Sequence, residues 1–188
     1  MVLTVVALGG AAAAGLLFLS GSGPQPGSAP AATAAAAAPD EVGEPPVPSD
    51  PTGTATLADP AVTTAKVPYR TASQWCSLLT AEDIRAVTGF DQRGAPDNTL
   101  LCTHYFAAEA GYLFVSDIPA AAGAAYTVRG NSAILYQSGP TSCEVSVALN
   151  RSGGVLDIDV RGVRSPRVPL CEAAVNLAGR AFDRLPHA

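Results

Sequence analysis

The spacing of apolar and polar side chains after residue 66 predicts a helix at each end of a folded region. The first is expected from Thr80 to Gly89, because Thr80 suits a helix cap, Asp83 can complete a capping box and Gly89 can end the helix. The second is expected over residues 169–185, where apolar side chains recur every three or four positions until Pro186.

Between these helices the pattern predicts four to six short strands. The strand segments are 100–106, 112–117, 126–137, 143–149 and 155–160, and the third is expected to break into two at Gly130-Asn131. Alternation is clearest in the last two segments, which indicates one buried face and one face in water. The expected fold is α+β, with an antiparallel sheet and the N-terminal and C-terminal helices on one of its faces.

The first third of the chain has a different composition. Residues 1–19 contain an uncharged apolar run typical of a signal peptide or membrane anchor, and residues 20–66 form a Pro/Ala-rich segment expected to be a disordered linker. The folded domain is predicted over residues 67–188. Ser20 stands where a bacterial lipoprotein has its lipidated cysteine, so lipidation is not expected. The predicted location is extracytoplasmic, either secreted or anchored by residues 1–19.

Charge is divided along the chain in the same way. All eleven basic residues lie at or after Lys66, whereas five of the sixteen acidic residues precede it. The net charge of −5 therefore belongs to residues 1–65. The part of the chain from Lys66 onward has eleven basic and eleven acidic residues, so it is formally neutral, and it has no basic patch. Neither a nucleic acid nor an anionic membrane surface is therefore expected as a partner, and membrane contact is expected only through residues 1–19 if they are retained.

The four cysteines are predicted to form two disulfides. Their number is even, no pair has the C-x-x-C spacing of a redox or zinc site, and export places them in an oxidising compartment. Three pairings are open, of which the sequential one, Cys76 with Cys102 and Cys143 with Cys171, would tie each helix start to a nearby strand. A nucleophilic Cys76 would need a histidine partner, for which only His104 is available in the domain.

Five stretches of the domain together resemble a known family. They are WCSLLTAEDIRAVTG, CTHYF, VRGNSA, CEVSVALNRSGGVLDIDV and LCEAAVNLAGRAFDRLP, within residues 73–186. The family consists of actinobacterial secreted proteins, often lipoproteins, catalogued as domain of unknown function 3558. The resemblance implies a cell-envelope protein with family disulfides and no assigned activity, so it transfers no catalytic residue. The chain departs from the family in lacking a lipobox and in having Tyr105 where a tryptophan is common.

Few side chains suggest catalytic or metal chemistry. His104 is expected to be a partly exposed strand residue without partners. Asp157 and Asp159 point to the same face of one strand and could bind a cation, but solvated strand carboxylates are the expected role. No metal or cofactor is expected.

The candidate ligand-binding residues are three arginines, Arg161, Arg164 and Arg167, spaced every third position. Guanidinium groups suit an oxyanion such as a phosphate or an anionic wall polymer, whereas the alternative is a solvated polar loop. The sequence NRSGGV lacks the strand-loop-helix context of a phosphate-binding loop and is expected to be a hairpin turn.

Two functions from different classes follow from these residues. The first is a non-enzymatic envelope module that binds an unknown ligand or protein and is held outside the membrane by the linker. The second is a cell-wall hydrolase or other extracytoplasmic enzyme, which would require His104 to approach a carboxylate and a hydroxyl such as Ser116 or Thr103. No residue is assigned a catalytic role.

Overall fold

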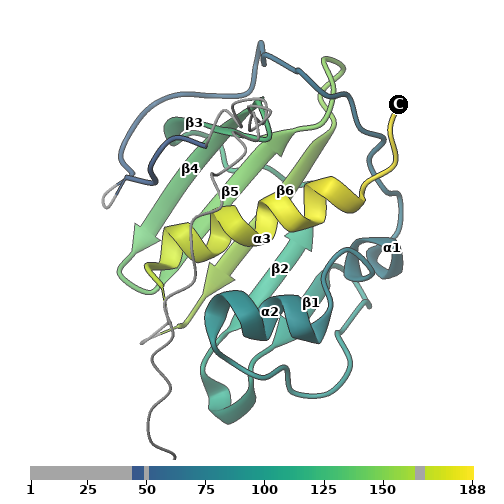
Figure 1. Cartoon of the computed structure of the whole chain (residues 1–188), viewed down its shortest axis with the longest axis vertical. Helices are drawn as coiled ribbons and strands as arrows, with labels where there is room; N and C mark the ends of the chain where they lie inside the picture. The colour runs from purple at the N-terminus through teal and green to yellow at the C-terminus, as the bar shows by residue number, and fades with distance from the viewer. Residues whose placement is uncertain (1–43, 49–50, 164–167) are drawn as a thin grey trace, which may run out of the picture. The chain divides into compact units, whose positions relative to one another are not determined.

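The computed structural model describes residues 44–48, 51–163 and 168–188, all of which belong to one compact unit. Its elements follow the predicted order of helix, strands and helix (Figure 1). They are α1 (Ala72–Cys76), α2 (Ala81–Thr88), β1 (Cys102–Tyr105), the 3-10 turn η1 (Ala107–Glu109), β2 (Tyr112–Ser116), β3 (Ala124–Val128), β4 (Asn131–Gly139), β5 (Ser142–Ala148), β6 (Val155–Arg161) and α3 (Leu170–Arg184).

The strands form one antiparallel sheet of six strands in the order β1-β2-β6-β5-β4-β3. Four hairpins join neighbouring strands. Those of β1 with β2, β3 with β4 and β5 with β6 follow the predicted segments and turns, whereas the pairing of β4 with β5 was not predicted. Strand β6 pairs with both β2 and β5, so it closes the sheet between the first hairpin and the others. The predicted α+β fold is confirmed.

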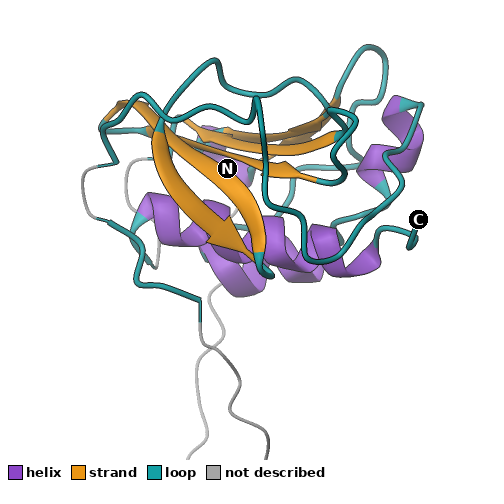
Figure 2. Cartoon of the chain, turned by 90° about the horizontal axis from the view of Figure 1, so that it is seen from above, coloured by secondary structure: helices purple, strands orange, loops and turns teal. Residues whose placement is uncertain are grey.

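Helices α2 and α3 lie on one side of this sheet, while loops cross the other side (Figure 2). Helix α3 covers the centre of the sheet, and its apolar side chains pack against the alternate apolar side chains of β5 and β6. Helix α2 begins and ends as predicted, with a full capping box between Thr80 and Asp83 and a left-handed Gly89 (φ 81°). The short helix α1 was not predicted, although it holds the buried Trp75, whose ring meets Tyr69 edge-on.

Two disulfides connect helices to the sheet. Cys76 at the end of α1 is bonded to Cys102 in β1, and Cys143 in β5 is bonded to Cys171 in the first turn of α3. The Cα atoms lie 5.0 Å and 5.2 Å apart, within the usual range for this bond. The predicted disulfides and their sequential pairing are confirmed.

Helices α2 and α3 are further joined by charge. Asp83, which is buried, accepts hydrogen bonds from Arg180 (3.0 Å) and Arg184 (2.5 Å) of α3. Burial opposes ionisation of this carboxyl, but the hydrogen bonds from Arg184, Thr80 and Arg180 outweigh it and hold the pKa of Asp83 well below its usual range. One carboxylate therefore caps α2 and fixes α3 beside it.

The folded unit begins earlier than the predicted boundary at residue 67. Asn131, fully buried, accepts from the backbone N–H groups of Thr63 and Thr64 and donates to the carbonyls of Thr64 and Ala148, all at 2.7–2.9 Å. Lys66 is 3% exposed, and its Nζ donates to the carbonyl oxygen of Leu185. The prediction of a disordered linker is therefore wrong for residues 51–66. Hydrogen bonds of the Asn131 and Lys66 side chains, together with backbone bonds such as that from Ser132 to Ala61, hold these residues to the domain, and composition does not show such bonds.

The turn between β3 and β4 is shifted by one residue from its predicted position. Arg129 and Gly130 have positive φ values of 53° and 77°, while Asn131 already belongs to β4. Asn131 is thus a buried strand residue and not a turn residue.

Within the described residues, no helix combines the length and the hydropathy needed to cross a membrane. The apolar run in residues 1–19, predicted to be a signal peptide or anchor, lies outside the described residues.

Candidate functional site

The candidate site lies on the face of the sheet opposite α3, under a loop that crosses the strands. Residues 117–123 connect β2 to β3, which are separated in the sheet by β6, β5 and β4. The backbone N–H of Ala120 in this loop donates to Ser146 Oγ of β5 at 2.9 Å. The loop ends at Gly123, where a Cβ atom would come within 2.3 Å of the Leu135 carbonyl oxygen, so only glycine allows this close approach. The loop therefore forms one side of an open cavity on this part of the face.

Acidic side chains of adjacent strands meet beneath the loop. The register places Glu144 of β5 opposite Asp159 of β6, and Ser146 opposite Asp157. Ser146 Oγ donates to Asp157 Oδ1 at 2.6 Å, and the carboxyl groups of Asp157 and Glu144 share a hydrogen bond. Two carboxyl groups can do so only if one of them holds a proton.

Burial is the main reason why this pair of carboxyl groups keeps a proton. It raises the pKa of Asp157 to about 8, helped by the charges of Glu144 and Asp159 and opposed by the hydrogen bond from Ser146. Burial also raises the pKa of Glu144, with the charge of Asp159 adding to the rise and that of Arg161 opposing it. At neutral pH the pair therefore holds one proton, which Asp157 and Glu144 share, and the rise in pKa is the clearer on the more deeply buried Asp157.

Arg161 compensates the third carboxylate. Its Nε and Nη2 atoms lie 2.6 Å and 2.5 Å from Asp159 Oδ2, and its guanidinium group lies over the ring of Phe114 at 5.8 Å. The Asp159–Arg161 pair is neutral, and the Glu144–Asp157 pair with its shared proton carries one negative charge. The site thus has a single uncompensated charge at neutral pH.

The cavity in front of these groups has a volume of about 200 Å³. Its lining combines polar and apolar side chains, which are Leu101, Phe114, Ser116, Ile118, Pro119, Glu144, Asp157, Asp159 and Arg161. Apolar side chains together with a few convergent polar groups are typical of a small-ligand site.

The expectation of solvated carboxylates is wrong for both aspartates of β6. Asp157 and Asp159 are each only 4% exposed, although they point away from the helices as their alternation predicted. The loop and neighbouring side chains bury them, which the pattern of a single strand cannot indicate.

The candidate arginines are only partly described. Arg161 is a half-exposed partner of Asp159, whereas Arg164 and Arg167 lie outside the described residues. The described arginine therefore balances a carboxylate of this chain and does not have its guanidinium group free for an external oxyanion.

His104 differs from its expected role in both exposure and partners. It is 1% exposed, its Nδ1 lies 3.1 Å from Gln92 Oε1, and its Nε2 lies 3.3 Å from Cys102 Sγ. Since an amide oxygen only accepts, Nδ1 carries the proton, and burial lowers the pKa of His104 to about 4, so the ring is neutral at pH 7. The prediction of a partly exposed strand residue is wrong.

The geometry also separates His104 from the hydroxyl groups that a hydrolase would need. His104 pairs with Leu113 on the face toward the helices, whereas Thr103 and Ser116 point to the opposite face. A catalytic group of His104 with Ser116 or Thr103 is therefore contradicted. Together with Cys76 and Cys102, His104 forms the one cluster of metal-ligand type among the described residues, but both sulfurs are joined in a disulfide and are not thiolates.

Sequence reasoning missed Glu144, Ser146 and the covering loop. The signal that could have found them is the pair of alternating segments CEVSVAL and VLDIDV, whose polar positions come into register when the two strands form a hairpin. Ser146 would then have been expected beside Asp157.

Comparisons with family models, with curated proteins and with solved structures each found no match for this chain.

Proposed function

We propose that this protein is an extracytoplasmic binding module of the cell envelope, tethered or secreted through its N-terminal residues, and related to the actinobacterial family it resembles. The pair of disulfides carries the proposal, because such bonds persist in oxidising compartments and are rare in the cytosol. Both bonds join helices to the sheet, as expected of a domain that works outside the cell.

The cavity beneath the loop is the place where this module would bind a small ligand. Its single uncompensated negative charge and the acceptor oxygens of Glu144 suit a ligand that carries one amino group, and the ring of Phe114 suits an apolar surface of the same ligand. The amino sugars of bacterial envelopes have this chemistry when their nitrogen is not acylated.

The compartment is tested by mass spectrometry of the native protein, purified from the organism that makes it and alkylated with and without reductant. Four sulfurs that resist alkylation until reductant is added would support the proposal. Four sulfurs that react without reductant would reject the compartment.

The ligand class is tested by NMR titration with glucosamine, using N-acetylglucosamine as the uncharged matched probe. We expect glucosamine alone to shift the amide signals of Ala120 and Ser146, and we expect Glu144→Gln to abolish the shift because it removes the charge. Equal shifts with both sugars, or none with either, would reject the amino-group preference.

A glycoside hydrolase built on the two carboxyl groups is the second reading, favoured by the raised pKa of Asp157. The separation of the two groups argues against it. Retaining enzymes hold their carboxyl groups about 5–5.5 Å apart and inverting enzymes hold them further apart, whereas Glu144 and Asp157 are in direct hydrogen-bond contact. Binding is therefore the better supported function.

A further inference from the structure

A short proline-rich segment lies against the other end of the domain, away from the acidic cavity. Residues 44–48 have the sequence Glu-Pro-Pro-Val-Pro, and we refer to them as the strap. The strap contacts Tyr126 of β3 and the turn that follows this strand. Its Val47 is half-buried and packs against the core cluster.

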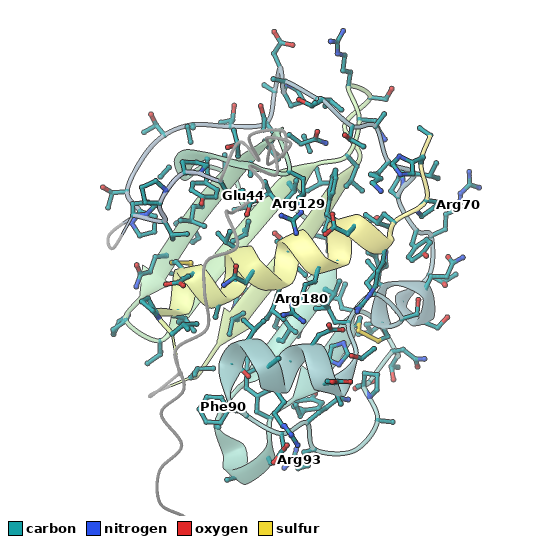
Figure 3. All side chains as sticks on the ribbon, in the orientation of Figure 1. Glu44, Arg70, Phe90, Arg93, Arg129 and Arg180 are labelled. Atoms are coloured by element: carbon teal, nitrogen blue, oxygen red, sulfur yellow. A yellow bond between two sulfur atoms is a disulfide. The ribbon has the colours of Figure 1, made fainter. Side chains whose placement is uncertain are left out.

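Two polar contacts hold the strap in register. The Tyr126 hydroxyl donates a short hydrogen bond to the carbonyl oxygen of Pro45, and the backbone N–H of Arg129 donates to Glu44 Oε1 at 2.8 Å. Figure 3 shows Glu44 and Arg129 next to each other beside α3. Burial, followed by the charge of Glu44, raises the pKa of Tyr126, so the hydroxyl stays protonated and remains a donor.

The turn that receives Glu44 is itself held in an unusual conformation. Arg129 has a φ of 53°, which is uncommon for a residue with a side chain, and its guanidinium group bonds to Asp183 of α3 through Nε (3.1 Å) and Nη2 (2.9 Å). The α3 contact holds the guanidinium group where its Nη1 atom also lies 3.9 Å from Glu44 Oε1, and the backbone N–H is directed at the same carboxylate. The domain, and not the strap, thus supplies the donor that receives the Glu44 carboxylate.

The strap does not fill the space next to it. A cavity of about 530 Å³ lies between the strap and the first turns of α3, lined on the domain side by Tyr126, Gln137, Pro140, Leu170, Glu172 and Val175. A segment that belonged to the core would close-pack against it. The strap is instead held by two hydrogen bonds, an ion pair between Glu44 and Arg129 Nη1 (3.9 Å) and the apolar side chain of Val47, which is the character of a bound peptide.

From these contacts we propose that the surface formed by Tyr126, Arg129 and the start of α3 is a docking site for an extended, proline-rich segment led by a glutamate, and that residues 44–48 are its resident, reversibly bound occupant. Three prolines restrict the strap to extended conformations before it binds, so little conformational entropy is lost on docking. The aromatic ring supplies the platform and the hydroxyl that proline-rich ligands use.

The docking is tested in the full chain by hydrogen exchange with mass spectrometry. Pro45→Gly/Pro46→Gly is expected to raise the exchange rate of the peptide that contains Arg129 about tenfold, because its N–H loses the Glu44 acceptor. Pro24→Gly/Pro26→Gly makes the same change outside the strap and is expected to leave that rate unchanged. Unchanged exchange rates in peptides from β5 and β6 would show that the variants keep the fold.

The site is then tested with a free peptide of residues 43–50, GEPPVPSD. At millimolar concentration this peptide is expected to slow hydrogen exchange at Arg129 in the double-glycine variant, whereas a scrambled peptide is not. In the wild type the peptide is expected to leave the exchange rate unchanged, because the site is already occupied. An unaltered Arg129 rate in the double-glycine variant, or no effect of the peptide on it, would overturn the proposal. Protection that rises with protein concentration would place the strap of a second copy in the site and would overturn the assignment to the same chain.

Discussion

At the scale of single residues, Asp157 is the side chain whose properties depend most on its surroundings. Burial raises its pKa to about 8, so the folded state holds a proton that the unfolded chain releases above a pH of about 4. A carboxyl whose pKa is raised in the folded state stabilises the fold fully only at pH values below its pKa in the unfolded chain. Its contribution is lost as the pH rises from about 4 through 8.

We therefore expect Asp157→Asn to stabilise the protein at high pH. The asparagine amide can accept from Ser146 and donate to Glu144 as the protonated carboxyl does, but it does not titrate. The free energy of unfolding should exceed that of the wild type by about 2 kcal/mol at pH 9 and match it near pH 4. Urea denaturation across this pH range measures the difference, and a constant difference at all pH values would contradict the raised pKa.

His104 titrates with the opposite sign. Burial lowers its pKa to about 4, so the neutral ring stabilises the fold above the unfolded value of about 6.5, and this contribution is lost as the pH falls toward 4. We expect the stability difference between wild type and His104→Gln to shrink as the pH is lowered from 7 to 4. Thermal unfolding at several pH values would show this, and a difference that grows on acidification would refute it.

Asn131 makes a structural contribution of a different kind, because all of its side-chain polar groups are buried and satisfied. We expect Asn131→Ala to destabilise the protein by about 3 kcal/mol, since Thr63, Thr64 and Ala148 lose their partners in a site with little access to water. Ser132→Ala, which removes a hydrogen bond to Ala61 at the exposed surface, is the matched control and should cost less than about 1 kcal/mol. Equal losses would show that Asn131 is not the main attachment point.

At the scale of elements, α2 and α3 depend on one carboxylate. Asp83 caps α2 and accepts hydrogen bonds from two arginines of α3. Because the fold lowers the pKa of Asp83, its stabilising effect is complete above a pH of about 4, the pKa in the unfolded chain, and is lost as the pH falls further. We expect Asp83→Asn to lower the free energy of unfolding by about 2–4 kcal/mol at pH 7. Glu82→Gln alters an exposed acid in the same helix turn and should change it by less than about 0.5 kcal/mol, as chemical denaturation would reveal.

The same elements show what a sequence can predict. Thr80, Asp83 and Gly89 act on neighbours within one helix, so local rules predicted α2 correctly, and alternation predicted the hairpins of the sheet. The burial of Asp157 and His104 could not be predicted in this way. It depends on loops and strands distant in the sequence, which cover one face of the sheet and bring Gln92 to the other.

At the scale of the whole molecule, the folded unit is completed by a segment whose composition resembles a linker. Residues 51–66 contain few large apolar side chains, yet Ala55 pairs with Gly123, and Lys66 pairs with His187 near the end of the chain. Lys66 also lies over the ring of Phe182 with its Nζ 5.3 Å from the centroid. The segment thus holds together the crossing loop, β4 and the end of α3, and hydrogen bonds rather than apolar burial determine where the domain begins.

This attachment predicts how the protein tolerates shortening from its N-terminus. A chain that starts at residue 51 keeps every partner of Asn131 and should melt within a few degrees of the full chain. A chain that starts at residue 67 lacks three of the four partners of the Asn131 amide and also lacks Lys66. We expect the shorter chain to lose about 3–6 kcal/mol of stability, which corresponds to a melting temperature lower by more than 10 °C for a domain of this size. Calorimetry of the two chains makes the comparison with both disulfides retained. If the two chains melted at the same temperature, residues 51–66 would contribute nothing to the folded unit, and its boundary would return to residue 67.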